Sequence, residues 1–163
     1  MASKPQDRTL AAWRSLLEAH AVLLDRLSRE LEAETGLPVG FYDVLLHLNE
    51  APQRRLPMHE LAHRVLISKS GLTRLVDRMV AEGYLEREPA EDDRRVVYAC
   101  LTASGRDRLV GAAPVHLRGI AEHFGRHLSD AEADTLRELL GRVIVAGTRD
   151  PGPDPRLAPA DPS

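Results

Sequence analysis

The sequence predicts an α+β fold class, namely a mostly α-helical protein with one small β-hairpin. Two observations lead to this expectation. Aromatic residues make up only 4% of the 163 residues, which favours helices packed by Leu, Val and Ala over a β-rich fold. Apolar residues recur at intervals of three and four along most of the chain, and strand-like runs gather only around residues 84–101. A chain of this length is expected to form one compact domain.

The first helix is expected over about residues 8–35, after a disordered N-terminus of residues 1–7. Its apolar positions step by three and four for three heptads: Leu10, Trp13, Leu17, His20, Leu24, Leu27 and Leu31. Leu16 and Leu23 widen this seam beyond what one helix needs for packing within its own subunit. We therefore expect the helix to pair with a second copy of the chain in a homodimer.

The segment from Leu56 to Glu82 predicts two short helices joined by a tight turn. The first has an apolar face that includes Leu61 and Val65, and Pro57 suits its first turn. Ser68 is a favourable N-cap for the second helix, which is expected to run to about Glu82. A helix, a tight turn and a capped helix form the helix-turn-helix arrangement.

The second helix of this pair has two sharply different faces. One is an apolar stripe, formed by Leu72, Leu75, Val76, Met79 and Val80. The other is polar and carries Lys69, Ser70, Thr73, Arg74, Asp77 and Arg78. Such a face can read bases and phosphates in a DNA major groove, although an ordinary solvated face is the commoner reason for this pattern.

A charged hairpin follows the helix pair and favours DNA. Residues 84–101 predict two short strands joined by a turn. The turn ends in Arg94 and Arg95, which could lie over phosphates or enter a minor groove. A solvated turn paired with Asp92 and Asp93 would explain these arginines taken alone. Their position directly after the helix pair favours a DNA-binding wing instead.

In these residues the chain resembles the MarR family of winged helix-turn-helix regulators. The matching motifs are Met58–Ala62, Ser68–Met79, Glu82–Arg87, the wing pattern Asp93–Arg95 and Leu101–Gly105, within a resemblance that spans roughly Leu10 to Val145. It implies a homodimeric transcription factor, usually a repressor, that is often released by small phenolic or other anionic ligands. It also implies a single domain over 8–147, with a winged helix-turn-helix at about 38–101 and dimerisation helices at about 8–35 and 102–147.

The DNA-binding residues are expected on the second helix of the pair and on the wing. The major-groove and phosphate set is Ser68, Lys69, Ser70, Thr73, Arg74 and Arg78, and the wing set is Asp93, Arg94 and Arg95, with Asp93 orienting Arg95. The net charge of −3 does not oppose this, because six Lys or Arg and only two acidic residues lie between Gln53 and Arg78. The expected partner is a pseudo-palindromic double-stranded DNA.

The C-terminal part predicts two more helices and a tail. A long helix that starts near Thr102 would be lined by Val110, Ala113, Leu117, Ile120, Phe124 and Leu128. A capping box at Ser129 and Glu132 opens the last helix, whose apolar stripe is Leu136, Leu140 and Val143. Residues 148–163 hold five of the eleven prolines and are expected to be disordered.

The resemblance also implies where an effector would bind. Ligands of the family often lie between the dimerisation helices and the DNA-binding lobe, where this chain would bring Trp13, His20, Tyr42 and His116. A small aromatic acid could stack on Trp13 and accept hydrogen bonds from Tyr42 or a protonated histidine. The alternative is that these four residues only pack the dimer core.

His123 and His127 have the i, i+4 spacing at which two imidazoles can share a metal ion. No cysteine or acidic residue with suitable spacing accompanies them, so polar residues at a helix border are the preferred interpretation. We therefore predict neither a metal site nor a cofactor.

Other classes of protein find little support in the sequence. It has no Gly-rich phosphate loop and no nucleophile motif, so we predict no enzymatic activity. No apolar run suits a membrane span, no signal peptide is evident, and the lone Cys100 suggests a reducing compartment, so we expect a cytoplasmic protein without a membrane partner. The rival function is a dimeric small-molecule- or partner-binding helical protein whose winged fold is not used for DNA. The presence of Arg74, Arg78 and Arg95 favours DNA binding.

Overall fold

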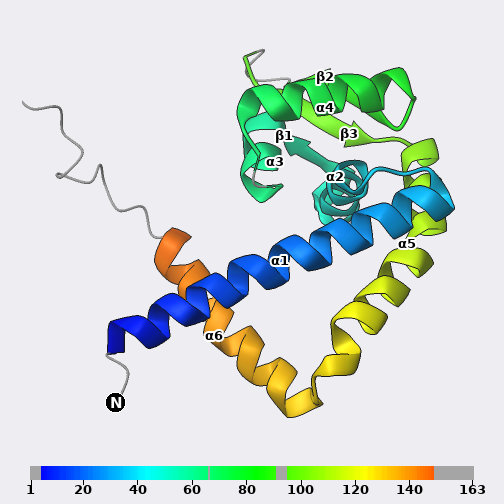
Figure 1. The fold of residues 1–163 in the computed structure, drawn as a ribbon. Helices are drawn as coiled ribbons and strands as arrows, with labels where there is room; N and C mark the ends of the chain where they lie inside the picture. Colours follow the sequence, from blue (N-terminus) through cyan, green and yellow to red (C-terminus); the bar gives the residue numbers. More distant parts are fainter. Residues whose placement is uncertain (1–4, 66, 91–94, 149–163) are drawn as a thin grey trace, which may run out of the picture. The chain divides into compact units, whose positions relative to one another are not determined.

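The computed structural model describes residues 5–65, 67–90 and 95–148 and divides into two units, residues 1–123 and 124–163. The first unit contains α1 (Pro5–Thr35), α2 (Val39–Glu50), η1 (Pro52–Arg54), β1 (Arg55–Pro57), α3 (Met58–Arg64), α4 (Lys69–Ala81), β2 (Leu85–Pro89), β3 (Val97–Leu101) and α5 (Ala103–His123) (Figure 1). The second contains η2 (Gly125–His127) and α6 (Asp130–Thr148). These elements confirm the predicted helical fold with a small hairpin. The single domain over 8–147 and the disordered termini remain predictions.

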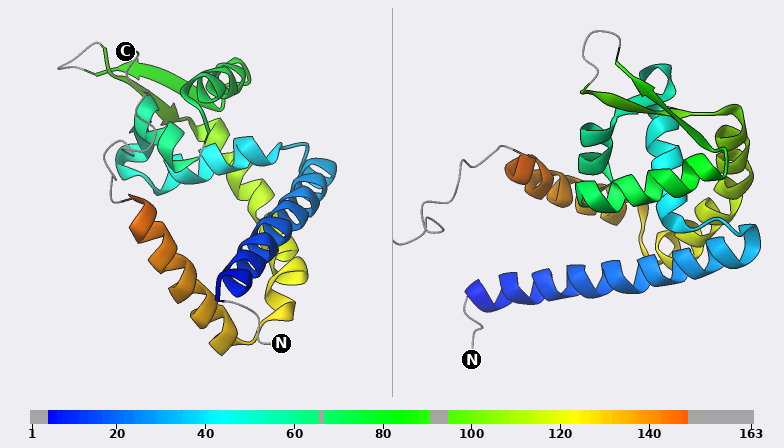
Figure 2. Two further views of the ribbon diagram at one scale, coloured as in Figure 1. Left: turned by 60° about the vertical axis from the view of Figure 1, so that its left-hand side comes forward. Right: turned by 90° about the horizontal axis from the view of Figure 1, so that it is seen from above.

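The three strands form one antiparallel sheet in the order β1-β3-β2 (Figure 2). β2 and β3 are the two expected wing strands, and Ala99 of β3 faces Leu56 of β1 on one side and Arg87 of β2 on the other. β1 was not expected, because a three-residue strand that ends in proline is too short to show an alternating pattern. Pro57 is the last residue of β1 and also the N-cap residue of α3, which begins at Met58. The prediction that Pro57 lies in the first turn of the helix was wrong.

The helix α4 has the two faces that its sequence predicts. Ser68 is its N-cap, and its Oγ accepts a hydrogen bond from the Gly71 amide at 3.1 Å. Beyond its other end, Gly83 adopts a φ of +75°, the left-handed conformation that lets the chain turn from α4 into β2. The buried stripe residues, each at most 1% exposed, are Leu72, Val76 and Met79.

The hydrophobic core of the first unit is built around α2. The helices α3 and α4 and the strands β1 and β3 all pack against it. From the long helices, α1 adds Leu31 and α5 adds Leu109 and Ala112 to the same core. These residues fix one part of each long helix to the winged lobe, which is the part of the first unit from α2 to β3. For α1, the fixed part is its C-terminal end. The buried residues of α2 itself are Phe41, Tyr42, Val44, Leu45 and Leu48.

Within the first unit, α5 buries a different face from the predicted apolar stripe, and the predicted length of the helix was wrong. Val110 and Leu117 are each 62% exposed, and Phe124 and Leu128 lie beyond the end of the helix at His123. The buried face is lined mainly by small residues, which give little hydrophobic signal in the sequence and allow close approach. The buried residues of α5 are Gly105, Leu109, Ala112 and Gly119.

The seam of α1 and the stripe of α6 leave much apolar surface uncovered. In α1, Trp13 is 54% exposed and Leu17 is 49% exposed, whereas Leu31 is completely buried. In α6, the predicted capping box is confirmed, with the Ser129 amide donating to Glu132 Oε2 at 2.9 Å, yet Val143 is 65% exposed. Within the described parts of the chain, no helix is long and apolar enough to cross a membrane.

Candidate DNA-binding interface

The polar face of α4 is open to solvent along its whole length. The structure exposes every residue of the predicted groove-reading set, which is Ser68, Lys69, Ser70, Thr73, Arg74 and Arg78. These residues lie opposite the buried stripe, so the core fixes the direction in which they project. The face is therefore presented on a rigid, packed helix.

The hydroxyl residues at the start of α4 are used by the helix itself. Ser68 caps the helix, and Ser70 Oγ lies 3.3 Å from Ser68 Oγ. Thr73 Oγ1 donates to the Lys69 carbonyl at 2.9 Å. Among the described residues, Lys69 and Arg74 have no such partner. They are the side chains of this face best placed to contact an external anion.

Arg78 is held differently from Arg74. Its guanidinium carbon lies 5.1 Å from the centre of the Phe41 ring, a cation–π contact that ties the end of α4 to α2. Phe41 in turn meets the Tyr84 ring edge-on, with 6.4 Å between centroids. The Arg78 head group is thus partly committed to packing within the lobe.

A residue that the sequence did not single out, Arg87 of β2, links the wing to α4. Its Nη1 lies 2.5 Å from Asp77 Oδ1, and its Nη2 donates to the Thr73 carbonyl at 3.3 Å. The pair neutralises Asp77, the one carboxylate on the polar face of α4, which would otherwise repel phosphate. The sequence feature that could have indicated the role of Arg87 is the alternation of side chains in β2, which places Leu85 and Arg87 on the same side of the sheet.

A basic hollow of about 470 Å³ lies between the helix pair and the wing, and we call it the wing hollow. Its cationic lining includes Lys69, Arg87 and Arg95, and it has an apolar floor. Arg95 is therefore placed where the wing was expected to carry charge, whereas Asp93 and Arg94 lie outside the described residues. The complete lining is Met58, His59, Lys69, Leu72, Thr73, Arg87, Arg95, Val96 and Val97.

Two of the four predicted effector residues meet between α2 and α5. The rings of Tyr42 and His116 are 4.4 Å apart between centroids, tilted by 42°, and His116 Nδ1 is buried without a hydrogen-bond partner. Trp13 and His20 are instead exposed on α1. At 1.5 Å per residue, Trp13 lies about 27 Å along the helix axis from Leu31, where α1 joins the core.

Burial perturbs the titratable groups of this α2–α5 cluster. It lowers the pKa of His116, which the neighbouring Asp43 only partly opposes. It also raises the pKa of Asp43, against the lowering effects of His116 and His47. The pKa of Tyr42 is raised by burial, with smaller contributions from Asp43 and Glu50. The cluster therefore favours a neutral imidazole and a neutral phenol.

The histidine pair considered for metal binding is not a helical pair. α5 ends at His123, so His127 lies in η2 and the assumed i, i+4 geometry was wrong. His123 Nε2 is instead 2.5 Å from Glu30 Oε1 of α1. The described part of the chain contains no group of three or more His, Cys, Asp or Glu residues suited to a metal ion.

Cys100 lies partly buried in β3. Burial raises its pKa to about 11, and a hydrogen bond with Glu88 acts in the same direction. Its thiol is therefore protonated at neutral pH and is a weak nucleophile.

Sequence relatives of the chain are transcription regulators. Residues 35–96 match the family model described as MarR family. The HTH-type transcriptional regulator PecS of Dickeya dadantii is 33% identical over 128 residues, which cover 76% of this chain and 74% of PecS. The HTH-type transcriptional repressor YetL of Bacillus subtilis is 32% identical over 112 residues, which cover 69% of this chain and 66% of YetL.

Solved structures agree with these relatives. Sco3205, a MarR family transcriptional regulator from Streptomyces coelicolor crystallised in complex with DNA, has a TM-score of 0.81 and 31% identity, covering 93% of this chain and 94% of Sco3205. AbsC, a MarR family regulator from the same organism, has a TM-score of 0.79 and 29% identity, covering 90% of this chain and 97% of AbsC. With its winged helix-turn-helix fold and these matches, the chain belongs to the MarR family of transcriptional regulators.

Proposed function

We propose that this protein is a sequence-specific, double-stranded-DNA-binding transcription regulator that acts as a homodimeric repressor and not as an enzyme. The observation that carries the proposal is the open polar face of α4 beside the cationic wing hollow. Lys69 and Arg74 project from this face, and the buried stripe holds the helix rigid. The DNA complex of Sco3205 and the regulatory names of the relatives support the same function.

The homodimer is supported by the apolar surface that one chain leaves uncovered. Trp13 and Leu17 of α1 are about half exposed, and Leu139 and Ile144 of α6 are 49% and 63% exposed. Exposed apolar seams of this extent mark sites of association in soluble proteins. A two-fold dimer would present two α4 helices about one DNA turn, roughly 34 Å, apart and so select a pseudo-palindromic duplex.

The two arginines of α4 provide the main test of this function. Arg74→Ala should reduce affinity for a selected operator by roughly 1–3 kcal/mol if the side chain reads a base. Arg78→Ala should cost less, because Arg78 also packs on Phe41. Fluorescence anisotropy at fixed salt measures both effects, with Ser15→Ala on the exposed surface of α1 as the control. Full-strength binding by the Arg74→Ala, Arg78→Ala double variant would contradict the assignment of α4.

The wing is expected to act on the DNA backbone. Arg95→Ala should weaken binding to many sequences alike, since phosphate or minor-groove contact carries little base information. Asp93→Ala should give a milder loss in the same direction, and Arg94 is expected to share the backbone contact. A changed sequence preference without a loss of affinity in Arg95→Ala would refute this role.

A small aromatic or anionic effector would regulate DNA binding through the α2–α5 cluster. The support is the unpartnered, buried Nδ1 of His116 beside the Tyr42 ring, with Trp13 and His20 of the dimerisation helix as further candidates. A ligand that favours a DNA-incompetent spacing by about 2–3 kcal/mol would reduce operator affinity some 30- to 150-fold. The alternative is that these residues only pack the protein.

Titration with salicylate-like acids distinguishes the two roles of these residues. Release of operator DNA by the acid supports the effector site, and His116→Gln should then weaken this release. No release up to millimolar acid would leave packing as the role of these residues. Operator binding by the ligand-free protein is measured first, since its absence would favour a partner- or ligand-binding protein whose winged fold is not used for DNA.

A further inference from the structure

A second hollow lies where α3 meets the start of α4, and we call it the elbow hollow. Its volume is about 340 Å³, and its lining residues are His59, Ala62, His63, Ile67 and Lys69. It shares His59 and Lys69 with the wing hollow. The two hollows therefore adjoin at these two residues, and together we call their linings the band.

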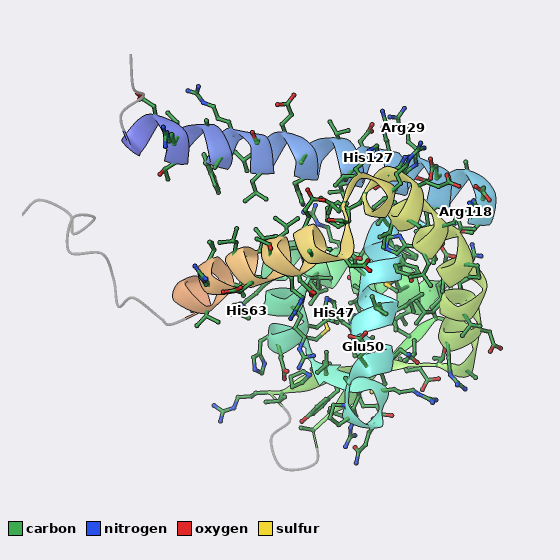
Figure 3. All side chains as sticks on the ribbon, turned by 90° about the horizontal axis from the view of Figure 1, so that it is seen from below. Arg29, His47, Glu50, His63, Arg118 and His127 are labelled. Atoms are coloured by element: carbon green, nitrogen blue, oxygen red, sulfur yellow. The ribbon has the colours of Figure 1, made fainter. Side chains whose placement is uncertain are left out.

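The polar lining of this band is basic or neutral. No carboxylate of the described residues lines either hollow. His59 and His63 are four residues apart on α3, so they project from one face, and both are exposed (Figure 3 labels His63). Glu60 is the one acidic residue of α3, and it is paired with Arg64 at 2.6 Å.

The carboxylates of Asp77 on α4 and Glu88 next to β1 are held in ion pairs, and the acidic residues of α2 line neither hollow. From α4, Lys69 lines the hollow, and Asp77 is paired with Arg87. From β1, Arg55 contacts both Glu88 and the Tyr98 ring, while β3 carries no charged residue. The other titratable or charged residues of α2 and α4 are Tyr42, Asp43, His47, Glu50, Arg74 and Arg78.

The lining combines cationic groups with one exposed apolar side chain. Ile67 is 38% exposed between α3 and α4 and touches the same hollow as the two imidazoles and the Lys69 ammonium. A phosphate beside a deoxyribose has the matching chemistry, because it offers an anion next to an apolar ring edge. We infer that the elbow hollow binds the DNA backbone, with Lys69, His59 and His63 on phosphate and Ile67 against sugar, so that affinity rises as pH falls.

This inference rests on the proposed DNA-binding function and adds a proton-dependent contact to it. Histidine ordinarily changes charge near neutral pH, and a phosphate beside the ring favours the protonated form. The complex then binds more protons than the free protein, so lower pH favours the complex. Each imidazole that gains a proton in the complex would add to the gain in affinity at low pH. The added phosphate contacts would also steepen the dependence of affinity on salt.

The test compares DNA binding by the intact protein at about pH 8 and about pH 5.5, across a series of salt concentrations. Two duplexes of about 30 base pairs are used, one recovered by selection with the wild-type protein and one of random sequence. The variants are His59→Gln, His63→Gln, their double variant and His63→Lys, which fixes the positive charge. His127→Gln, an exposed histidine outside the hollow, is the matched control, and thermal melting checks each fold.

We expect the wild-type affinity for both duplexes to rise roughly tenfold or more at the lower pH, with a steeper salt dependence. The double variant should lose most of this gain, His63→Lys should bind more tightly at pH 8, and His127→Gln should behave as wild type. A pH gain that survives in the double variant, or one that His127→Gln also removes, overturns the inference while leaving the proposed function intact. Failure of the wild-type protein to bind either duplex would instead refute the proposed function.

Discussion

The winged lobe and the dimerisation helices carry apolar stripes with the same helical spacing, but they bury them very differently. In α4 the stripe residues Val76 and Met79 are completely buried by the rest of the chain. In α1 the corresponding seam leaves Trp13 and Leu17 about half exposed. Periodicity therefore reports that a helix has an apolar face, whereas only the contacts show whether its own chain or a second copy covers that face.

The helix α5 shows the same contrast within a single element. Its inner face is lined by Gly105 and Ala112 and packs closely on the lobe, whereas Val110 and Leu117 point outward. A Cβ added at Gly105 would lie 2.2 Å from the Tyr84 carbonyl oxygen, so glycine is required for this approach. Small residues and Leu109 line the intramolecular contact, and the large apolar residues Val110 and Leu117 remain exposed.

The largest expected effect follows from charging the exposed seam. The Trp13→Glu, Leu17→Glu double variant should sediment as a monomer at micromolar concentration and keep its helical circular dichroism. A monomer can bind only one half of the operator at a time, so the loss of linkage between two subunits should reduce operator affinity roughly 100-fold or more. Ser15→Glu on the same helix is the control and should remain dimeric. A dimeric double variant would show that α1 does not form the subunit interface.

Two of the three glycines of α5 test its two faces. Gly105→Ala should destabilise the protein by about 2–3 kcal/mol, because its methyl group meets backbone atoms that cannot move aside. Gly111→Ala has no neighbour within 4 Å and should stabilise by up to about 1 kcal/mol through helix propensity. Urea unfolding measures both changes. Similar effects for the two variants would contradict the close packing of α5 on Tyr84.

A smaller effect is expected from the pair that links the wing to α4. Arg87→Gln should weaken operator binding several-fold, in line with the roughly 0.2–1 kcal/mol of a partly exposed ion pair. If Arg87 acts by orienting α4 through Asp77, the Asp77→Asn, Arg87→Gln double variant should lose no more than either single variant. Additive losses in this double-mutant cycle would indicate that Arg87 contacts DNA directly.

The smallest expected effect concerns pH and stability in the α2–α5 cluster. Because burial lowers the pKa of His116, the unfolded chain binds its proton more readily than the folded chain. Stability should therefore fall as pH decreases below the ordinary histidine pKa of about 6.5. His116→Gln should give a shallower fall in melting temperature between about pH 7 and about pH 5, and the exposed His127→Gln should match wild type. Parallel curves for wild type and His116→Gln would exclude this contribution.

Local patterns were enough to predict most of the fold and the polar face of α4. The Ser68 cap, the stripe of α4 and the capping box at Ser129 each depend on residues within one or two turns of each other, and the wing strands pair across a single turn of the chain. Interactions of this kind depend mainly on neighbouring residues and little on the rest of the fold. The sequence alone therefore indicates them.

The tertiary structure decided the features that join residues far apart in the chain. β1 exists because Leu56 pairs with Ala99, Arg87 reaches Asp77 across the turn, and His123 meets Glu30 instead of His127. The close contact of Gly105 with the Tyr84 backbone is likewise invisible to periodicity, because small residues contribute little apolar signal. Each of these contacts depends on how helices and strands pack, and packing is a property of the whole fold rather than of any segment.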